Sequence, residues 1–273
     1  MSATAPAIPL PIMTEPRGLT RLTGAVRDTI AVTWRNLLAY IRVPQLLIFS
    51  TIQPVVFVLL FRYVFGGAIP IQGGDYVDYL MPGIFVQTVV FGALGAAVGL
   101  AADMHTGLIE RFRSLPMARS AVLAGRTTAD LIRNVFVVLL MGLVGFLVGF
   151  RVHTNVPSAL AAVVLVVLFG YAFSWIFATV GLMVGDPETA QAAAFPVMAP
   201  LVFASTAFVP LDTMPGWLQA FAAHQPVSAT VDAARALLSG GPTLTPVLKC
   251  LGWIAAILIV FAPLAVHRYR KVA

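Results

Sequence analysis

The sequence predicts an all-α membrane protein with six transmembrane helices, an N-terminal interfacial helix, a short cytoplasmic helix and an external re-entrant helical hairpin. Two observations lead to this fold class. Of the 273 residues, 59% are hydrophobic and 10% are charged, whereas about 25% of the residues in a soluble domain are charged. The apolar residues also form continuous runs close to the roughly 20 residues that cross a bilayer as a helix. A membrane β-barrel would instead show short segments of alternating polarity.

The N-terminal region is predicted to hold a tail and a surface helix. Residues 1–17 are expected to form a flexible cytoplasmic tail, because prolines interrupt them and the basic and apolar regions of a signal peptide are missing. In residues 18–42, apolar side chains recur at steps of three or four and arginines lie on another face. This pattern is typical of a helix along a membrane surface, and a solvated helix packed on the protein is the alternative. The interfacial residues are Arg21, Arg27, Trp34, Arg35 and Arg42.

Six apolar runs predict the transmembrane helices of a single domain over residues 18–266, followed by a cytoplasmic tail, 267–273. The spans cover residues 45–65, 83–102, 131–150, 158–183, 190–209 and 246–266, and residues 66–82 form a glycine-rich external loop between the first two. Thirteen of the 17 lysines and arginines then lie on one side, which the positive-inside rule identifies as the cytoplasm. We therefore expect a multi-pass protein of the cell inner membrane with both termini in the cytoplasm.

A basic stretch, 101–133, is the longest charged interruption between apolar runs and carries five arginines. Within it, residues 106–115 can form a short helix that stops before Pro116, because a residue that precedes proline disfavours the helical region. Its apolar residues fall on one face, which suits docking to a cytoplasmic partner. The predicted docking residues are Leu108, Ile109, Glu110, Arg111, Phe112, Arg113, Leu115 and Pro116.

The external segment 210–245 is too polar to span the membrane and too apolar for a solvated loop. Trp217 and Phe221 suit a short helix that dips into the outer leaflet, because aromatic side chains favour the interface. Pro226 suits the start of a second helix, which the glycines at 240 and 241 would end. We therefore expect a re-entrant hairpin that caps the outer end of the bundle.

Uncharged polar residues within the spans are candidates for a transport path. They are Gln53, Gln87, Thr88, Ser174, Ser205 and Thr206. The alternative is that such side chains bond to the neighbouring backbone or helices.

Charged residues and glycines in the spans predict further contacts. Arg62, Arg133 and Lys249 are expected near span ends, where long side chains reach the interface. Arg126 and Arg133 lie within about one helical turn of Asp130, so an ion triad is expected at the entry of the third span. The glycines at 92, 95 and 99 are expected to allow close helix packing.

Several kinds of chemical site are missing from the sequence. The motif GxxxxGK[ST] is absent, so this chain is not expected to hydrolyse ATP by that route. GxSxG and HExxH are also absent, and there is one cysteine, so we predict no enzyme activity and no catalytic, cofactor-binding or metal-binding residue. The formal charge of +6 would also suit a nucleic-acid binder, but the arginines flank apolar runs. Membrane topology explains them better, and no nucleic-acid partner is expected.

Three stretches occur in a particular order along the chain. They are the amphipathic N-terminal helix, GLIERFRSLPMARSAVLAGRTTADLIR after the second span, and VPLDTMPGWLQAFAAHQPVSATVDAARALLSGG before the last span. In this order they resemble the permease subunits of ABC-2 type exporters, in particular the daunorubicin-resistance-like branch. The resemblance covers nearly the whole chain.

This resemblance implies that residues 106–116 are a coupling helix seated on a separate cytoplasmic ATP-binding-cassette ATPase, which would use ATP and Mg. It also implies a dimer with a second copy or a related permease, contact with membrane lipids, and export of an amphipathic drug, lipid or polyketide. The lack of a predicted midplane charge favours lipophilic cargo. An ion-coupled secondary transporter and a noncatalytic membrane scaffold are the alternatives.

Overall fold

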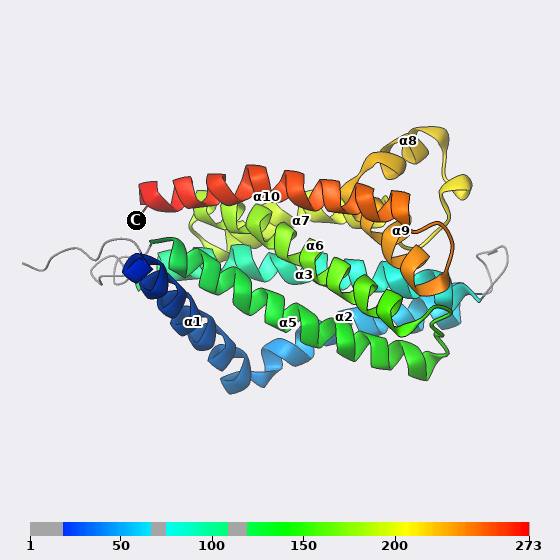
Figure 1. Cartoon of the computed structure of the whole chain (residues 1–273), viewed down its shortest axis with the longest axis horizontal. Helices are drawn as coiled ribbons and strands as arrows, with labels where there is room; N and C mark the ends of the chain where they lie inside the picture. The colour runs from blue at the N-terminus through cyan, green and yellow to red at the C-terminus, as the bar shows by residue number, and fades with distance from the viewer. Residues whose placement is uncertain (1–18, 67–74, 109–118, 273) are drawn as a thin grey trace, which may run out of the picture.

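The computed structural model describes residues 19–66, 75–108 and 119–272, and nearly all of these residues are helical. No strand occurs within these three ranges. The long helices lie side by side along the longest axis of the molecule (Figure 1). The predicted all-α class is therefore confirmed.

Two helices, α3 (Tyr76–His105) and α6 (Val156–Val184), form the centre of the bundle. In their most apolar windows, 67% of α3 and 61% of α6 are buried, against 33% for α5 and 17% for α10. The helices around them are α2 (Pro44–Leu60) with its π-helical continuation η1 (Phe61–Phe65), α5 (Arg119–Val148), α7 (Pro187–Phe203) and α10 (Leu244–Val272). Large apolar side chains on α2, α5 and α10 are exposed, which is expected of surfaces that face lipid.

Four of the helices are long and apolar enough to cross a membrane. They are α3, α6, Ala121–Val148 of α5 and Leu244–Lys271 of α10. The first predicted span corresponds to a shorter apolar helix, Thr51–Phe65. The fifth corresponds to α7, which has 17 residues with two prolines inside it. The count of six spans therefore remains a prediction.

The first part of α3 was wrongly expected to be a loop. The helix begins at Tyr76, so residues 76–82 do not belong to an external loop. The hydroxyls of Tyr76 and Tyr79 donate to the carbonyls of Phe208 and Thr206, both at 3.0 Å. These bonds hold the start of α3 against the chain that follows α7, and the helix continues through Pro82.

Helix α5, which corresponds to the third predicted span, also begins earlier than predicted, at Arg119 and not at residue 131. Leu123 is fully buried, in a cluster with Trp175 of α6 and Tyr269 of α10. This packing favours the helix over a solvated loop, because burying one such apolar side chain contributes about 2 kcal/mol. The N-terminal part of α5 therefore belongs to the bundle.

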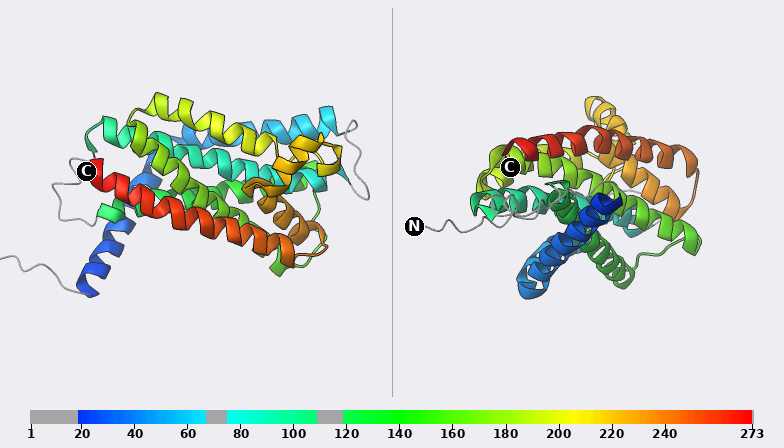
Figure 2. Two further views of the ribbon diagram at one scale, coloured as in Figure 1. Left: turned by 90° about the horizontal axis from the view of Figure 1, so that it is seen from above. Right: turned by 60° about the vertical axis from the view of Figure 1, so that its left-hand side comes forward.

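The amphipathic helix α1 (Leu19–Arg42) forms as predicted and leaves the bundle at an angle (Figure 2). Val32 and Thr33 are buried, and the Thr33 hydroxyl donates to the carbonyl of Gly125 on α5 at 3.1 Å. A Cβ at Gly125 would collide with Val32, so this glycine permits the close approach of α1 and α5. Trp34 on the other side is exposed.

At the opposite end of the bundle, α8 (Gly216–His224) and α9 (Pro226–Ser239) occur where the two hairpin helices are predicted. Pro226 starts α9, and Gly240 ends it with a φ of 93°. Trp217 is 75% exposed and Phe221 is 43% exposed, whereas the inner face of α9 packs on the bundle. The helices of the hairpin are confirmed, and its insertion into the outer leaflet remains a prediction.

Candidate functional site

The predicted docking segment lies mostly outside the described residues. These undescribed positions are Ile109, Glu110, Arg111, Phe112, Arg113, Leu115 and Pro116. Leu108 is described and is partly buried. The polar groups built around the last turns of α3, just before this segment, are therefore the part of the site that can be followed in detail.

An ionic junction joins three helices at this end of α3. Oδ2 of Asp103 lies 3.4 Å from Nη2 of Arg35 on α1 and 3.4 Å from Nη1 of Arg126 on α5. Among the described residues neither Arg126 nor Arg133 forms an ion pair with Asp130, so the predicted triad is wrong. The early start of α5 places Arg126 beside α3, where Asp103 is within its reach.

Three of the glycines of α3, at 92, 95 and 99, make room for arginine side chains. Arg126 donates to the carbonyl of Gly95 at 3.1 Å, and Arg133 donates to the carbonyl of Gly92. A Cβ at Gly92 or Gly99 would fall on the guanidinium of Arg133 or Arg126, respectively. The expectation that these glycines serve close helix packing is therefore corrected: they accommodate two guanidinium groups of α5.

Arg133 does not lie near the end of a span. It is 8% exposed, within the apolar helix Ala121–Val148, and its partner Gly92 is close to the middle of α3. The early start of α5 explains this difference. An ionisable group within an apolar span is unfavourable unless it is paired or serves a function.

A buried carboxylate lies one helical turn from Arg133. Asp130 is 1% exposed, and its Oδ1 accepts a hydrogen bond of 3.2 Å from the hydroxyl of Tyr40 on α1. Burial, followed by the charge of Asp130, raises the pKa of Tyr40 above its ordinary value of 10.0, so this hydroxyl remains a donor at neutral pH. Among the described residues, Oδ2 of Asp130 has no hydrogen-bond partner.

Two cavities meet at Arg133. The larger, about 310 Å³, is lined by Asn36, Tyr40, Arg126, Asp130 and Arg133. The smaller, about 120 Å³, brings together three predicted path residues, Gln53, Gln87 and Thr88. Gln53 is exposed, whereas Gln87 is 2% exposed and its Oε1 has no partner in the described chain. The smaller cavity therefore joins the surface of α2 to the centre of α3.

The other three predicted path residues lie away from these cavities and bond to protein groups. The hydroxyls of Ser174 and Ser205 donate to the carbonyls of Gly170 and Val202. Thr206 donates to Oδ1 of Asp232 at 2.8 Å. These bonds match the alternative role of polar residues in spans.

A cluster of polar residues joins the hairpin to the bundle. It is called the outer cluster here because it lies at the predicted outer end of the bundle, and it consists of Tyr79, Thr206, Asp232 and Arg235. The guanidinium of Arg235 lies 3.7 Å from the centre of the Tyr79 ring. It also donates to the carbonyls of Tyr79 and Thr206 and pairs with Asp232 at 3.1 Å. Sequence reasoning missed this cluster, although the spacing of Asp232 and Arg235 within one turn was a usable signal.

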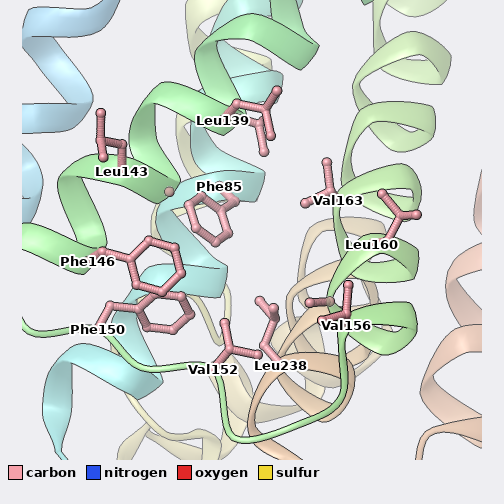
Figure 3. A pocket seen from close by; sticks show the side chains of 13 residues that line it. Phe85, Leu139, Leu143, Phe146, Phe150, Val152, Val156, Leu160, Val163 and Leu238 are labelled. Atoms are coloured by element: carbon pink, nitrogen blue, oxygen red, sulfur yellow. The ribbon is translucent and has the colours of Figure 1, made fainter.

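An apolar pocket of about 420 Å³ lies between the parts of α5 and α6 that are nearest to the hairpin (Figure 3). Phe85 of α3 and Phe146 of α5 line one side, and Leu160 of α6 and Leu238 of α9 line another. Such a pocket suits hydrocarbon. No sequence signal separates these residues from others that face lipid or the core.

Comparisons with known proteins identify the family of this chain. Residues 27–238 match the sequence profile of ABC-2 type transporters. The chain is 35% identical to the daunorubicin resistance ABC transporter permease DrrB1 of Streptomyces coeruleorubidus over 247 residues, covering 90% of this chain and 87% of that protein. It is 32% identical to the probable doxorubicin resistance ABC transporter permease DrrC of Mycobacterium tuberculosis, covering 92% and 94%. It is also 27% identical to the putative transport permease ycf38 of Cyanophora paradoxa, covering 78% and 75%. The chain therefore belongs to the ABC-2 type transporter family, as a transmembrane permease subunit of an ABC exporter.

Proposed function

We propose that this permease moves a lipophilic or amphipathic cargo, such as a drug, lipid or polyketide, out of the cytoplasm or the inner leaflet. The energy would come from ATP hydrolysed with Mg by a separate cytoplasmic ATP-binding-cassette ATPase. The names of the relatives DrrB1 and DrrC, which refer to resistance to daunorubicin and doxorubicin, support an amphipathic cargo. The missing phosphate-binding motif supports a separate ATPase.

The observation that carries the cargo proposal is the smaller cavity. Gln53 places polar groups at its exposed edge, and Gln87 and Arg133 place an amide and a guanidinium at its buried end. Phe91 and Leu94 provide apolar lining. A molecule with an apolar body and a few oxygen acceptors matches the chemistry of these groups, because ligand pockets combine an apolar lining with a few polar groups that fix orientation. With a volume of about 120 Å³, the cavity would hold a part of such a cargo and not the whole molecule.

The route of coupling follows from the ionic junction. The docking segment 106–116 would contact the ATPase directly after α3. Asp103 lies less than one turn from the end of α3 and pairs with Arg35 of α1 and Arg126 of α5. Movement of the docking segment would therefore act on α1, α3 and α5 together.

The proposed assembly is a dimer with a second copy or a related permease, in the inner membrane, with six spans and both termini in the cytoplasm. The concentration of arginine and lysine on one side supports the orientation. Counting α2 with η1 and α7 as spans requires the membrane or a partner to cover two helices shorter than the other four. Reporter fusions at Ala273 and Gly73 should report inside and outside, respectively, and the reverse pattern would contradict this topology.

The test of the proposed function is export from vesicles that contain the permease and a cytoplasmic ATP-binding-cassette ATPase that co-purifies with it. ATP should drive export of a fluorescent anthracycline, and Gln87→Leu should reduce export while the matched change Gln191→Leu, at an exposed position of α7, should not. ATP-independent export abolished by an ionophore would instead support an ion-coupled transporter, for which the buried carboxylate of Asp130 is the motivating observation.

A further inference from the structure

The larger cavity, about 310 Å³, lies where α1 packs on α5 beside α3. Its polar lining comes from Asn36 and Tyr40 of α1 and from Arg126, Asp130 and Arg133 of α5, and Gly95 and Gly99 bound it on the α3 side. None of the predicted path residues lines it. Its volume lies at the lower end of the range for small-molecule sites, roughly 300–1,000 Å³.

Charged side chains of both signs line the cavity, and the described protein groups satisfy only part of their hydrogen-bonding and charge-pairing capacity. Arg133 is 8% exposed, and within the described chain no carboxylate forms an ion pair with it. Asp130 is 1% exposed, and its Oδ2 has no partner among the residues described. The amide nitrogen of Asn36 is likewise a buried donor with no described acceptor. Unpaired buried charges are strongly unfavourable, so this arrangement calls for a ligand that supplies both partners.

We propose that this cavity binds a group that carries both a phosphate and a primary ammonium, as in the headgroup of phosphatidylethanolamine. The guanidinium of Arg133 and the amide of Asn36 would donate to phosphate oxygens, since a guanidinium presents parallel donors to phosphate. Arg126 adds positive charge, although Asp103 and the Gly95 carbonyl occupy two of its nitrogens. Oδ2 of Asp130 would accept a hydrogen bond from the ammonium.

The carboxylate makes the proposal specific. Basic pockets between membrane helices bind anionic headgroups in general. Asp130 disfavours a headgroup with negative charge alone, as in phosphatidylglycerol. A trimethylammonium, as in phosphatidylcholine, carries no N–H and cannot donate to Oδ2. The ammonium of an ethanolamine headgroup satisfies the acceptor and neutralises its charge.

The surroundings of the cavity favour a membrane lipid as the source of this headgroup. The two helices that contribute its polar lining also carry exposed apolar side chains, Ile30 and Trp34 on α1 and Ile132 and Phe136 on α5. These surfaces can contact acyl chains while the headgroup occupies the cavity. Soluble phosphoethanolamine has the same two charged groups and is the other source that the test must separate.

The test measures lipids retained by the purified full-length permease in micelles that contain equal amounts of phosphatidylethanolamine, phosphatidylglycerol and phosphatidylcholine, by native mass spectrometry. The wild-type protein should retain phosphatidylethanolamine in preference to both others. Asp130→Asn should lower the ethanolamine-to-glycerol preference by about tenfold or more, as expected for loss of one charge-assisted hydrogen bond. The matched control is Asp78→Asn, which neutralises a partly buried carboxylate near the start of α3, outside the cavity lining, and should leave the preference unchanged.

Equal retention of the three lipids by the wild-type protein would overturn the proposal, and this result does not depend on any variant being folded. An unchanged preference in Asp130→Asn would also overturn it. Excess phosphoethanolamine separates the sources: displacement of the lipid means that the soluble zwitterion also fits, and retention means that the site requires the lipid. Neither ATPase nor transport is involved, so the result is independent of the proposed function.

Discussion

Arginine side chains with little exposed area occur in two regions of this permease, and protein groups satisfy their hydrogen-bonding capacity to different degrees. In the outer cluster, Arg235 has a carboxylate, two carbonyls and an aromatic ring around one guanidinium. Beside the middle of α3, Arg133 bonds to the carbonyl of Gly92 and the side chain of Asn134. It lies 5.7 Å from the centre of the Tyr40 ring and has no ion pair among the described residues. Four of the five buried side-chain atoms without a described partner lie in this second region, on Asn36, Gln87, Asp130 and Asn134.

This difference indicates that the outer cluster has a structural role and that the region around Arg133 can bind further groups. A complete set of partners makes the outer cluster rigid, because any displacement of Arg235 breaks its bonds to two carbonyls and to Asp232 together. The region around Arg133 has two cavities and free donors and acceptors, so ligands or altered helix positions can satisfy it in more than one way. Conformational change and binding are therefore expected around Arg133, and the outer cluster is expected to keep one arrangement.

The largest effect is expected for Arg235→Met. The change removes the positive partner of Asp232 and the charged donor to the carbonyls of Tyr79 and Thr206. A hydrogen bond to a charged group contributes about 1.5–3 kcal/mol, so the loss of two such bonds should lower the free energy of unfolding by about 3 kcal/mol or more. Thermal unfolding in detergent should show a markedly lower Tm. The control is Lys249→Gln at an exposed position, which should change Tm little. Similar Tm values for the two variants would mean that the outer cluster does not stabilise the packing of the hairpin on the bundle.

The next effect concerns docking of the ATPase. If Phe112 is an apolar anchor of the docking segment, Phe112→Ala should weaken binding by about 2 kcal/mol, roughly thirtyfold. Co-purification of the ATPase and cargo-stimulated ATP hydrolysis should both fall, while insertion and dimerisation are unchanged. Glu110→Arg should also impair docking, with an effect that depends on salt. Wild-type values for both variants would exclude this segment as the coupling element.

A smaller effect is expected for Gly99→Ala. The new methyl group would occupy the position of the Arg126 guanidinium and displace it from Asp103 and the carbonyl of Gly95, which should lower the free energy of unfolding by about 1–2 kcal/mol. The same substitution at Gly252 of α10 meets no atom within 4 Å. Since alanine favours a helix over glycine by up to about 1 kcal/mol, Gly252→Ala should be neutral or stabilising. Equal Tm values for the two variants would show that Gly99 does not make room for Arg126.

The smallest effect is expected for Tyr40→Phe, which removes one hydrogen bond to Asp130 and about 1 kcal/mol of stability near neutral pH. The raised pKa of Tyr40 adds a pH dependence. Its stabilising contribution is fully present below the unfolded value of about 10 and is lost as pH rises through the higher folded value. Between pH 9 and 11, Tm should therefore fall more steeply for the wild-type protein than for Tyr40→Phe. Parallel curves would indicate that Tyr40 is not buried against Asp130.

Much of the fold could be predicted because helices respond to local patterns. The length of the apolar runs and their lack of alternation determined the all-α class, and the resemblance of three segments indicated the family. Pro226 and Gly240 marked the ends of a hairpin helix correctly, because proline suits the first turn of a helix and glycine accepts a positive φ at its end. The early starts of α3 and α5 were not predicted, because these turns are locally polar. Buried contacts with segments distant in sequence stabilise their helical conformation.

The amino-acid sequence by itself determined that this chain is a helical membrane protein without the phosphate-binding motif of an ATPase, and it supplied the candidates Gln53, Gln87 and Thr88 that line one cavity. Only the tertiary structure decided which carboxylate pairs with Arg126 and that Arg133 lies deep in the bundle. It also decided what the glycines at 92, 95 and 99 make room for. The physical reason is that an arginine side chain is long enough to reach several partners. Its neighbours in sequence are therefore a weaker guide than the helix packed beside it, and here the packing of α5 on α3 brings Asp103 and three glycines to the two guanidinium groups.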